Sequence, residues 1–403
     1  MMDWIREFMG MLWKTVSDQP DAKSGFLALI PETWRQGISA ILSIAPLMMI
    51  FPALFALTTV VERKGLGRIQ NRLGPNRVGP AGFLQFAADG LKTLTKEDIV
   101  PRAADQFVHF IAPLALVIPV FLTFSVLPFG KHLVPLNLES GLLFFFAIGA
   151  ATELSVFMAG WASRNKYSLL GALRAVAQMV SYEIPLILSA LSVVMVTGTL
   201  SLPQIVEAQG AGNGEWLSRW HVFTPWGFFG FALFLVAACA EANRSPFDLP
   251  EGESEIIAGY YLEYSGFKFA LFFLGEYLGL FAASGLGITL FLGGWHAPFP
   301  ILERWIPSYI WFFAKLGTLI GLFIWIRGTL PRVRMDQLMN LAWKFMLPLA
   351  LLNLIAAALW HFLPNAFARW TVTSLLLVSG YVGLGRALMP SSRIGKRVYR
   401  YAA

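Results

Sequence analysis

Apolar runs long enough to cross a lipid bilayer recur along the whole chain, separated by shorter polar segments. A transmembrane helix needs about 20 predominantly apolar residues. Nine segments meet or approach that length, and the fifth is short for a bilayer. They are Ile38–Val61, Phe107–Leu127, Gly141–Trp161, Ala175–Val196, Trp226–Glu241, Phe267–Leu292, Tyr309–Ile326, Trp343–Phe362 and Trp370–Met389. The pattern predicts an all-α, polytopic integral membrane protein with about nine transmembrane helices.

Two other segments carry apolar residues at helical spacing on one face only. The first runs from Trp4 to Val16, where charged residues interrupt any run that could serve as a cleavable signal peptide. The second runs from Phe83 to Leu94 and includes Phe86. Both patterns predict amphipathic helices that lie on a membrane or subunit surface.

Composition narrows the class of protein. The chain has 403 residues, of which 14% are charged, whereas a soluble domain carries roughly 25%. Its one cysteine, Cys239, cannot form an intrachain disulfide or hold an iron–sulfur cluster, and its five histidines form no ligand-spaced pair. We therefore expect this chain to bind no metal and no flavin. The net charge of +7 lies in loops between apolar runs, so it requires no nucleic acid partner.

The distribution of Lys and Arg predicts the orientation in the membrane. With the N-terminus outside, the inside loops and the C-terminal tail hold 22 Lys and Arg residues, and the outside loops between the spans hold four. Loops with more Lys and Arg lie on the cytoplasmic side. We expect the N-terminus outside and the tail Ser391–Ala403 in the cytoplasm, in a bacterial inner (plasma) membrane.

Four ionisable side chains fall inside the predicted spans: Glu153, Glu183, Glu276 and Lys315. Each costs about 2.5–3.5 kcal/mol on insertion scales unless it is paired or hydrated. One interpretation is structural, with Lys315 neutralising one of the carboxylates. The other is a line of proton-handling groups, since burial favours proton exchange by carboxyl groups near neutral pH. We also expect Pro185 to break the helix beside Glu183.

Three inside loops have distinctive compositions. Val61–Pro80 is basic and punctuated by Gly and Pro, and Trp325–Leu338 is a second basic loop with a Pro break. The third, Glu241–Glu255, carries five carboxylates, although loops on the predicted cytoplasmic side are otherwise rich in Lys and Arg. It could be a solvated loop that binds a divalent cation. Alternatively, it could be the acidic entrance of a route from the cytoplasm to the intramembrane carboxylates.

Together these motifs resemble the H subunit of respiratory complex I, the proton-pumping NADH–quinone oxidoreductase. The resemblance covers about residues 38–365 and rests on three motifs in the same order. These are Glu62 through Lys96-Glu97-Asp98, Glu241–Glu255 with its continuation Tyr261–Tyr264, and Arg327–Leu338. Glu183 in Ser181-Tyr182-Glu183 and Glu276 in Gly275-Glu276-Tyr277 also fall at family positions. It implies an extension at 1–37, an eight-helix core at 38–365, and an additional helix and basic tail at 366–403.

The resemblance implies a role in quinone reduction and in coupling this reaction to proton translocation. The residues expected at the quinone chamber are Glu62, Arg63, Arg72, Phe86, Asp89, Arg244 and Arg327. Those expected to couple the chamber to pumping are Glu153, Glu183, Glu241, Asp248, Glu251, Glu253, Glu255, Glu276 and Lys315. The substrate would be ubiquinone or menaquinone. The implied partners are the iron–sulfur and quinone-site subunits of the peripheral arm, small membrane subunits, antiporter-like subunits and membrane lipids.

Two other functions remain open from the sequence. The membrane anchor of an energy-converting hydrogenase belongs to the same superfamily and needs no quinone. An autonomous ion transporter would show an internal repeat and paired broken helices, and neither is evident. A transporter would purify alone, whereas a coupling subunit would co-purify with iron–sulfur proteins.

Overall fold

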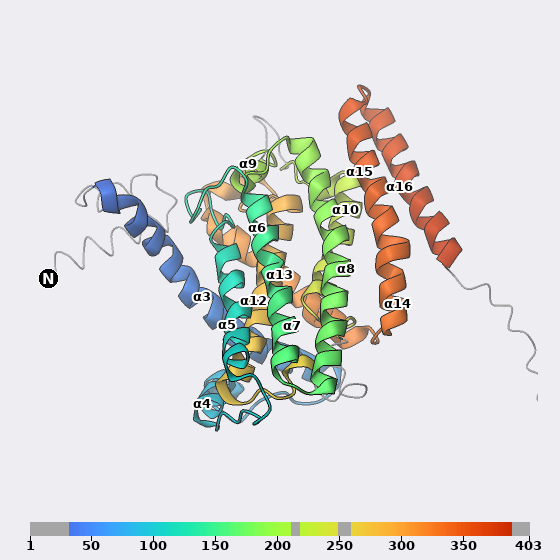
Figure 1. Ribbon diagram of the computed structural model, residues 1–403. Coiled ribbons are helices and arrows are strands. Elements are labelled where there is room, and N and C mark those ends of the chain that lie inside the picture. Colours follow the sequence, from blue (N-terminus) through green and yellow to red (C-terminus); the bar gives the residue numbers. More distant parts are fainter. Residues whose placement is uncertain (1–31, 211–217, 249–258, 389–403) are drawn as a thin grey trace, which may run out of the picture.

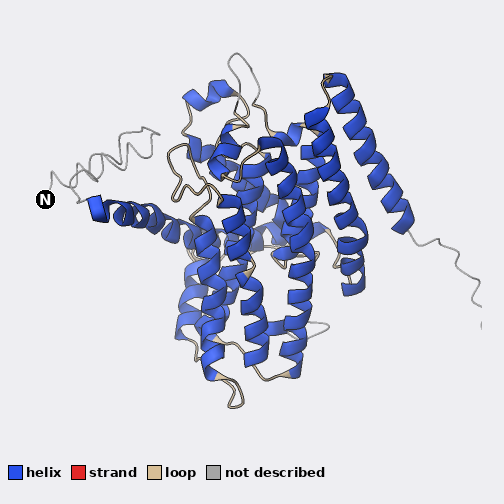
Figure 2. Cartoon of the chain, turned by 45° about the horizontal axis from the view of Figure 1, so that its top comes forward, coloured by secondary structure: helices blue, strands red, loops and turns tan. Residues whose placement is uncertain are grey.

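The computed structural model describes residues 32–210, 218–248 and 259–388, and within these ranges all regular secondary structure is helical (Figures 1 and 2). The elements are α3 Glu32–Ile69, η1 Pro80–Gly82, α4 Gln85–Thr95, α5 Gln106–Phe124, α6 Gly141–Gly149, α7 Ala151–Ala162, α8 Lys166–Thr197, α9 Leu202–Glu207, η2 His221–Phe223, α10 Pro225–Glu241, η3 Gly259–Tyr261, α12 Gly266–Phe291, η4 Pro300–Arg304, α13 Ser308–Thr329, α14 Met335–Asn340, η5 Leu341–Met346, α15 Leu347–Phe362 and α16 Ala366–Leu388. The predicted amphipathic segment at the N-terminus and the C-terminal tail lie outside the described residues.

Seven described helical segments are long and apolar enough to cross a membrane, which confirms an all-α, multi-pass architecture. They are Gln106–Phe124, Gly141–Ala162, Lys166–Thr197, Gly266–Phe291, Ser308–Thr329, Met335–Phe362 and Ala366–Ala387. The apolar helix α10 is shorter, as its sequence indicated, and α3 contains the first predicted span. The expected count of about nine is therefore approximate.

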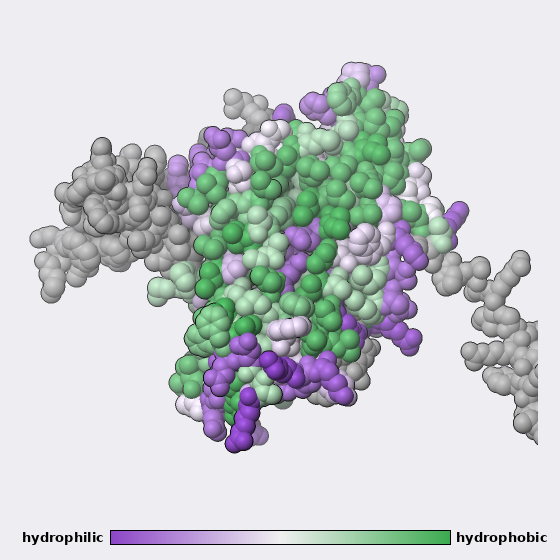
Figure 3. All heavy atoms as spheres, in the orientation of Figure 1, coloured by the Kyte–Doolittle hydropathy of each residue, from purple (hydrophilic) through white to green (hydrophobic). Residues whose placement is uncertain are grey.

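The helices form a bundle in which α8 packs against α7, α10 and α15, and α5 packs against α7 and α12. Figure 1 shows α3 leaning away from the bundle towards its N-terminal end and α16 as the outermost helix beside α15. On the face shown in Figure 3, apolar side chains cover most of the flank, with a small hydrophilic patch near its middle, and hydrophilic side chains gather at the ends. This distribution is the one expected for a protein that faces lipid on its sides and water at both ends.

Aromatic packing fastens α3 to the bundle where the two meet. Phe51 is fully buried and stacks on Phe124 with ring centroids 3.8 Å apart, and it also contacts Phe129 and Phe281. Rings of this size bury large apolar areas and add specific ring–ring attraction. The C-terminal end of α3, which carries the functional residues described below, is thereby held at a fixed place.

The expectation that Pro185 breaks its helix is wrong. α8 is 32 residues long and continues through Pro185. It begins after Asn165, whose side chain caps it, and ends before Gly198, which adopts the left-handed conformation. Proline removes only its own N–H, and the surrounding helices α7, α10 and α15 keep the segment helical. Glu183 thus projects from an unbroken helix.

Candidate functional site

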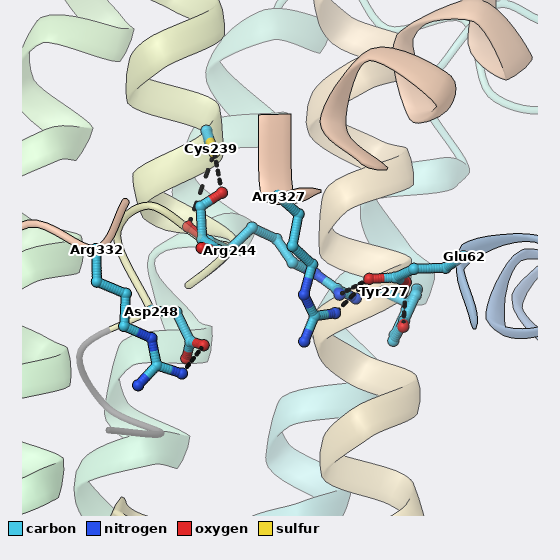
Figure 4. A network of polar contacts seen from close by, with 8 residues as sticks. Glu62, Cys239, Arg244, Asp248, Tyr277, Arg327 and Arg332 are labelled. Carbon is cyan, nitrogen blue, oxygen red and sulfur yellow. Dashed lines mark hydrogen bonds and ion pairs between the residues drawn. The ribbon is translucent and has the colours of Figure 1, made fainter. Parts of the chain in front are cut away.

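A buried carboxylate near the C-terminal end of α3 joins three other segments of the chain. Glu62 accepts hydrogen bonds from Arg244 Nη1 at 3.3 Å, from Tyr277 Oη at 2.5 Å and from Arg327 Nη1. Arg244 follows α10, Tyr277 belongs to α12 and Arg327 to the last turn of α13 (Figure 4). One negative group therefore holds two cations. We call Glu62, Arg244, Tyr277 and Arg327 the Glu62 cluster.

Arg244 is the most confined member of the Glu62 cluster. Its guanidinium lies 3.7 Å from the centroid of the Tyr277 ring, a cation–π contact. Its Nε and Nη2 atoms are buried and have no hydrogen-bond partner among the described residues. Burial alone would lower the pKa of Arg244, but Tyr277 and Glu62 raise it above its ordinary value. The side chain is a permanent cation, and the described part of the chain leaves two of its donor atoms unused.

A second ion pair lies beside this cluster. Arg332 Nη2 donates to Asp248 Oδ2 at 2.8 Å, and Val333 N donates to the carbonyl of Pro246 at 3.1 Å. These bonds tie the start of the acidic loop to the basic loop after α13 (Figure 4). Two loops of opposite charge are thus fixed to each other at the same end of the bundle as the Glu62 cluster.

Two adjoining cavities connect the Glu62 cluster with carboxylates deeper in the bundle. The smaller has an empty volume of about 260 Å³ and is lined by Asn243, Arg244, Ser245, Asp248, Phe273, Glu276 and Arg327. The larger, about 690 Å³, is lined mainly by apolar residues of α5, α7, α8 and α12, with Glu241 and Glu276. Because Asn243 and Glu276 belong to both linings, the two cavities adjoin at these side chains.

The deeper carboxyl groups form a series across the bundle. Glu276 Oε1 accepts a hydrogen bond from Tyr260 Oη at 2.7 Å, and Glu241 Oε2 is buried without a partner among the described residues. On the flank, Glu153 of α7 and Glu183 of α8 are half-buried and close enough to interact with each other.

Most of this chain matches a known protein family. The sequence model of the family described as NADH dehydrogenase matches residues 42–358. The chain belongs to this family. The H subunit of NADH-quinone oxidoreductase from Dehalococcoides mccartyi is 50% identical over 298 residues, which is 74% of this chain and 80% of that relative. The protein of the same name from Brevibacillus brevis is 44% identical over 326 residues, covering 81% and 94% of the two chains. The one from Geobacillus kaustophilus is 46% identical over 322 residues, covering 79% and 93%.

The part of the chain that matches the NADH dehydrogenase family contains the Glu62 cluster and both cavities, and it ends before α16. Of the other residues predicted at the chamber, Arg63 Nη1 pairs with Asp89 Oδ2 at 2.5 Å and so links α3 to α4. Arg72 donates to Gln70, and Phe86 lies exposed on α4. These four lie near the surface at that end of the bundle, outside the Glu62 cluster itself. Glu251, Glu253 and Glu255 lie outside the described residues.

Lys315 is not placed as its sequence position suggested. It lies about two turns into α13, and its Nζ donates to the carbonyls of Leu292, Gly294 and His296 at 2.6–2.8 Å. The ammonium also lies 4.1 Å from the Trp220 ring. All three of its protons are used by the loop after α12, so the interpretation that Lys315 neutralises an intramembrane carboxylate is wrong.

Three uncharged side chains of the site were missed from the sequence. Gln178 is fully buried in α8, and its Nε2 lies within hydrogen-bond distance of Ala240 O, Asn243 Oδ1 and Phe247 O. It clamps the end of α10, where Glu241 lies, to α8. Tyr260 donates a hydrogen bond to Glu276, and Tyr277 donates one to Glu62. In the sequence, only the position of Tyr277 directly after Glu276 indicated that it could belong to the site.

The described residues contain no group of three or more His, Cys, Asp or Glu that could hold a metal ion. In the Glu62 cluster, most polar atoms bind one another, and the Nε and Nη2 atoms of Arg244 have no partner among the described residues. The site thus places the fixed positive charges of Arg244 and Arg327 beside carboxyl groups that can exchange protons.

Proposed function

We propose that this membrane subunit of an NADH–quinone oxidoreductase forms part of the quinone chamber and couples quinone reduction to proton translocation. The names of its relatives support quinone as the substrate. The observation that carries the proposal is the shared wall of the two cavities, because it places the cationic Glu62 cluster next to the deeper carboxyl groups. A reaction that changes charge at the cluster would therefore act directly on Glu276.

The Glu62 cluster is suited to a quinone headgroup during reduction. Reduction places negative charge on the headgroup oxygens before protons arrive, and fixed donors in a site of low polarity stabilise such charge strongly. Arg244 and Arg327 would supply that stabilisation, and the Nε and Nη2 atoms of Arg244, which no described residue binds, would face the headgroup. Arg63, Arg72, Phe86 and Asp89 would form the outer part of the chamber on α3, the following loop and α4.

The coupling route would run from the Glu62 cluster to the flank of the bundle. A proton demand or charge change at Arg244 would reach Glu276 across the smaller cavity, then Glu241, and then the pair Glu153 and Glu183. Asp248, with the acidic loop that follows it, would supply protons at the cytoplasmic mouth. Lys315 has no place in this route, because its protons are held by backbone carbonyls.

We also propose that the chain binds the partners expected from its family. The cytoplasmic face with the Glu62 cluster would meet the iron–sulfur and quinone-site subunits of the peripheral arm, and the flank with Glu153 and Glu183 would meet the other membrane subunits. Residues 38–365 would form the family core. α16, which lies beyond the family match and covers α15, would add a helix against lipid.

The proposed orientation has the C-terminus in the cytoplasm of a bacterial cell. It rests on the 22 Lys and Arg residues of the inside loops and tail against four in the outside loops. A reporter fused after Ala403 should be active only when it remains in the cytoplasm. Activity of a reporter that requires export would contradict both the orientation and an odd number of spans.

The chamber assignment is tested by Arg63→Ala in the assembled complex. This change removes the ion pair with Asp89 that links α3 to α4, so quinone reductase activity should fall several-fold. Electron transfer from the donor to a soluble artificial acceptor should be unchanged, because that reaction does not need the chamber. Arg102→Ala, at an exposed arginine on the same side, is the matched control. A parallel loss of both activities in Arg63→Ala would contradict the assignment.

A further inference from the structure

A histidine and a tyrosine are stacked on each other near the N-terminal ends of α5 and α12, outside the Glu62 cluster. His109 lies in the first turn of α5 and is fully buried, and its ring stacks on that of Tyr264 with centroids 3.9 Å apart and planes 7° apart. The Glu263 backbone approaches the imidazole. However, neither ring nitrogen of His109, nor the Tyr264 hydroxyl, makes a well-formed hydrogen bond within the described residues.

Packing alone does not account for this choice of side chains. Two phenylalanines would give the same stack and would leave no polar atom to satisfy. Buried polar atoms without a protein partner are unusual and are ordinarily satisfied by ordered water. Three such atoms gathered in one stack therefore point to bound water along the His109–Tyr264 pair.

On the proposed cytoplasmic side, the pair lies close to exchangeable surface groups. Asp98 is exposed and pairs with Lys268 at 2.7 Å, while Glu263 accepts from the Asn165 amide at 2.7 Å. All three charged groups, Asp98, Glu263 and Lys268, act electrostatically on His109. Surface carboxylates of this kind can collect protons from water and pass them inward.

On the interior side, the pair leads towards Glu276. The rings of Tyr264 and Tyr260 pack against the same side chain, Phe272, with centroids 4.8 and 5.5 Å away. Tyr260 then donates to Glu276. Leu116, two turns after His109 on α5, belongs to the lining of the cavity that contains Glu276. Through Phe272, the pair is therefore packed against Tyr260, the residue that binds Glu276.

We propose that His109 and Tyr264, with bound water, form a proton inlet from the cytoplasmic surface to Glu276. A neutral imidazole accepts a proton at one nitrogen and releases one from the other, and a phenol accepts a proton at its oxygen while donating its own. After a complete transfer both side chains are neutral again, with the imidazole proton on the opposite nitrogen. The imidazole must return to its first tautomer before the next proton passes, and no other reactant is needed. The inlet rests on the proposed coupling role of Glu276. It would supply protons without drawing them through the quinone chamber.

The test is proton pumping by the assembled complex in vesicles. His109→Phe keeps the stack on Tyr264 and removes both nitrogens, and Tyr264→Phe removes one oxygen atom. Each should slow proton pumping by roughly ten-fold or more, while assembly stays normal. Imidazole added to His109→Gly should restore part of the rate. His361→Phe and Tyr381→Phe, at exposed positions on α15 and α16, should pump normally.

The outcomes separate the inlet from the coupling role on which it rests. Normal pumping by Tyr264→Phe and by His109→Phe, with pumping lost in Glu276→Gln, would overturn the inlet alone. Normal pumping in Glu276→Gln would overturn the coupling role and the inlet with it. If His109→Phe assembles poorly, Tyr264→Phe decides, because loss of a single oxygen leaves the ring contacts with His109 and Phe272 in place.

Discussion

Replacing Arg244 with lysine should lower quinone reductase activity on the order of a hundred-fold, the loss typical of removing one preorganised donor from a developing anion. Lysine keeps the charge. It cannot reproduce the planar contact with the Tyr277 ring at 3.7 Å, nor hold Glu62 with one nitrogen and present others to a ligand. The measurement is quinone-dependent turnover of the purified complex, beside electron transfer to a soluble artificial acceptor, which should not change.

Arg334→Lys is the matched control for Arg244→Lys. Arg334 lies exposed on the neighbouring loop, and its hydrogen bonds with Gln337 and Leu338 run through its backbone. Its replacement should leave both activities intact. If the Arg244→Lys complex kept full quinone turnover, the guanidinium would be a structural counter-ion of Glu62 and would have no part in the chamber.

The second large effect is expected at the carboxyl pair on the flank. Glu183→Gln preserves size and most hydrogen bonding but removes an exchangeable proton. Because Glu183 interacts with Glu153 and would pass protons to it in the proposed route, the variant should slow proton pumping on the order of a hundred-fold. The complex should still assemble. Glu183→Asp, shorter but acidic, should retain more activity, and Glu153→Gln should resemble Glu183→Gln.

Two comparisons sharpen this test. Glu139→Gln, at an exposed glutamate in the loop before α6, should pump normally. Adding Lys315→Met to Glu183→Gln should not restore pumping or assembly, since Lys315 is bound to the carbonyls of another loop. Unchanged pumping by the assembled Glu183→Gln complex would remove Glu183 from the route.

Hydropathy predicted where the chain crosses the membrane but not where its helices begin. α8 starts at Lys166, nine residues before the expected span at Ala175, because its first turns carry polar residues into the aqueous layer. α3 likewise runs on through the basic segment to Ile69. The apolar content of a segment indicates which part of it can lie in the bilayer, whereas the ends of a helix depend on capping residues such as Asn165.

The sequence identified the candidate residues as charged residues within or next to apolar segments. It did not show which of these residues contact one another. Glu62 lies 182 residues from Arg244 and 265 residues from Arg327, so no local pattern could join them. Gln178 was missed because an uncharged amide in an apolar helix gives no signal. Lys315 was misjudged because depth along a helix says nothing about a loop that folds back over it.

The fixation of Lys315 has a consequence for the direction of proton movement. Its Nζ lies beside the carbonyls that follow α12, at the end of the bundle that faces outward in the proposed orientation, and these carbonyls bind all three of its donor positions. In that orientation, a proton leaving Glu276 towards the outer surface would have to pass this group, which has no free site to accept it. In the proposed route, the proton would leave instead at the half-buried pair Glu153 and Glu183 on the flank. If the proposed route is correct, protons would therefore enter the carboxyl groups from the cytoplasmic side and leave them through the flank of the bundle at Glu153 and Glu183, with no exit on the outer side.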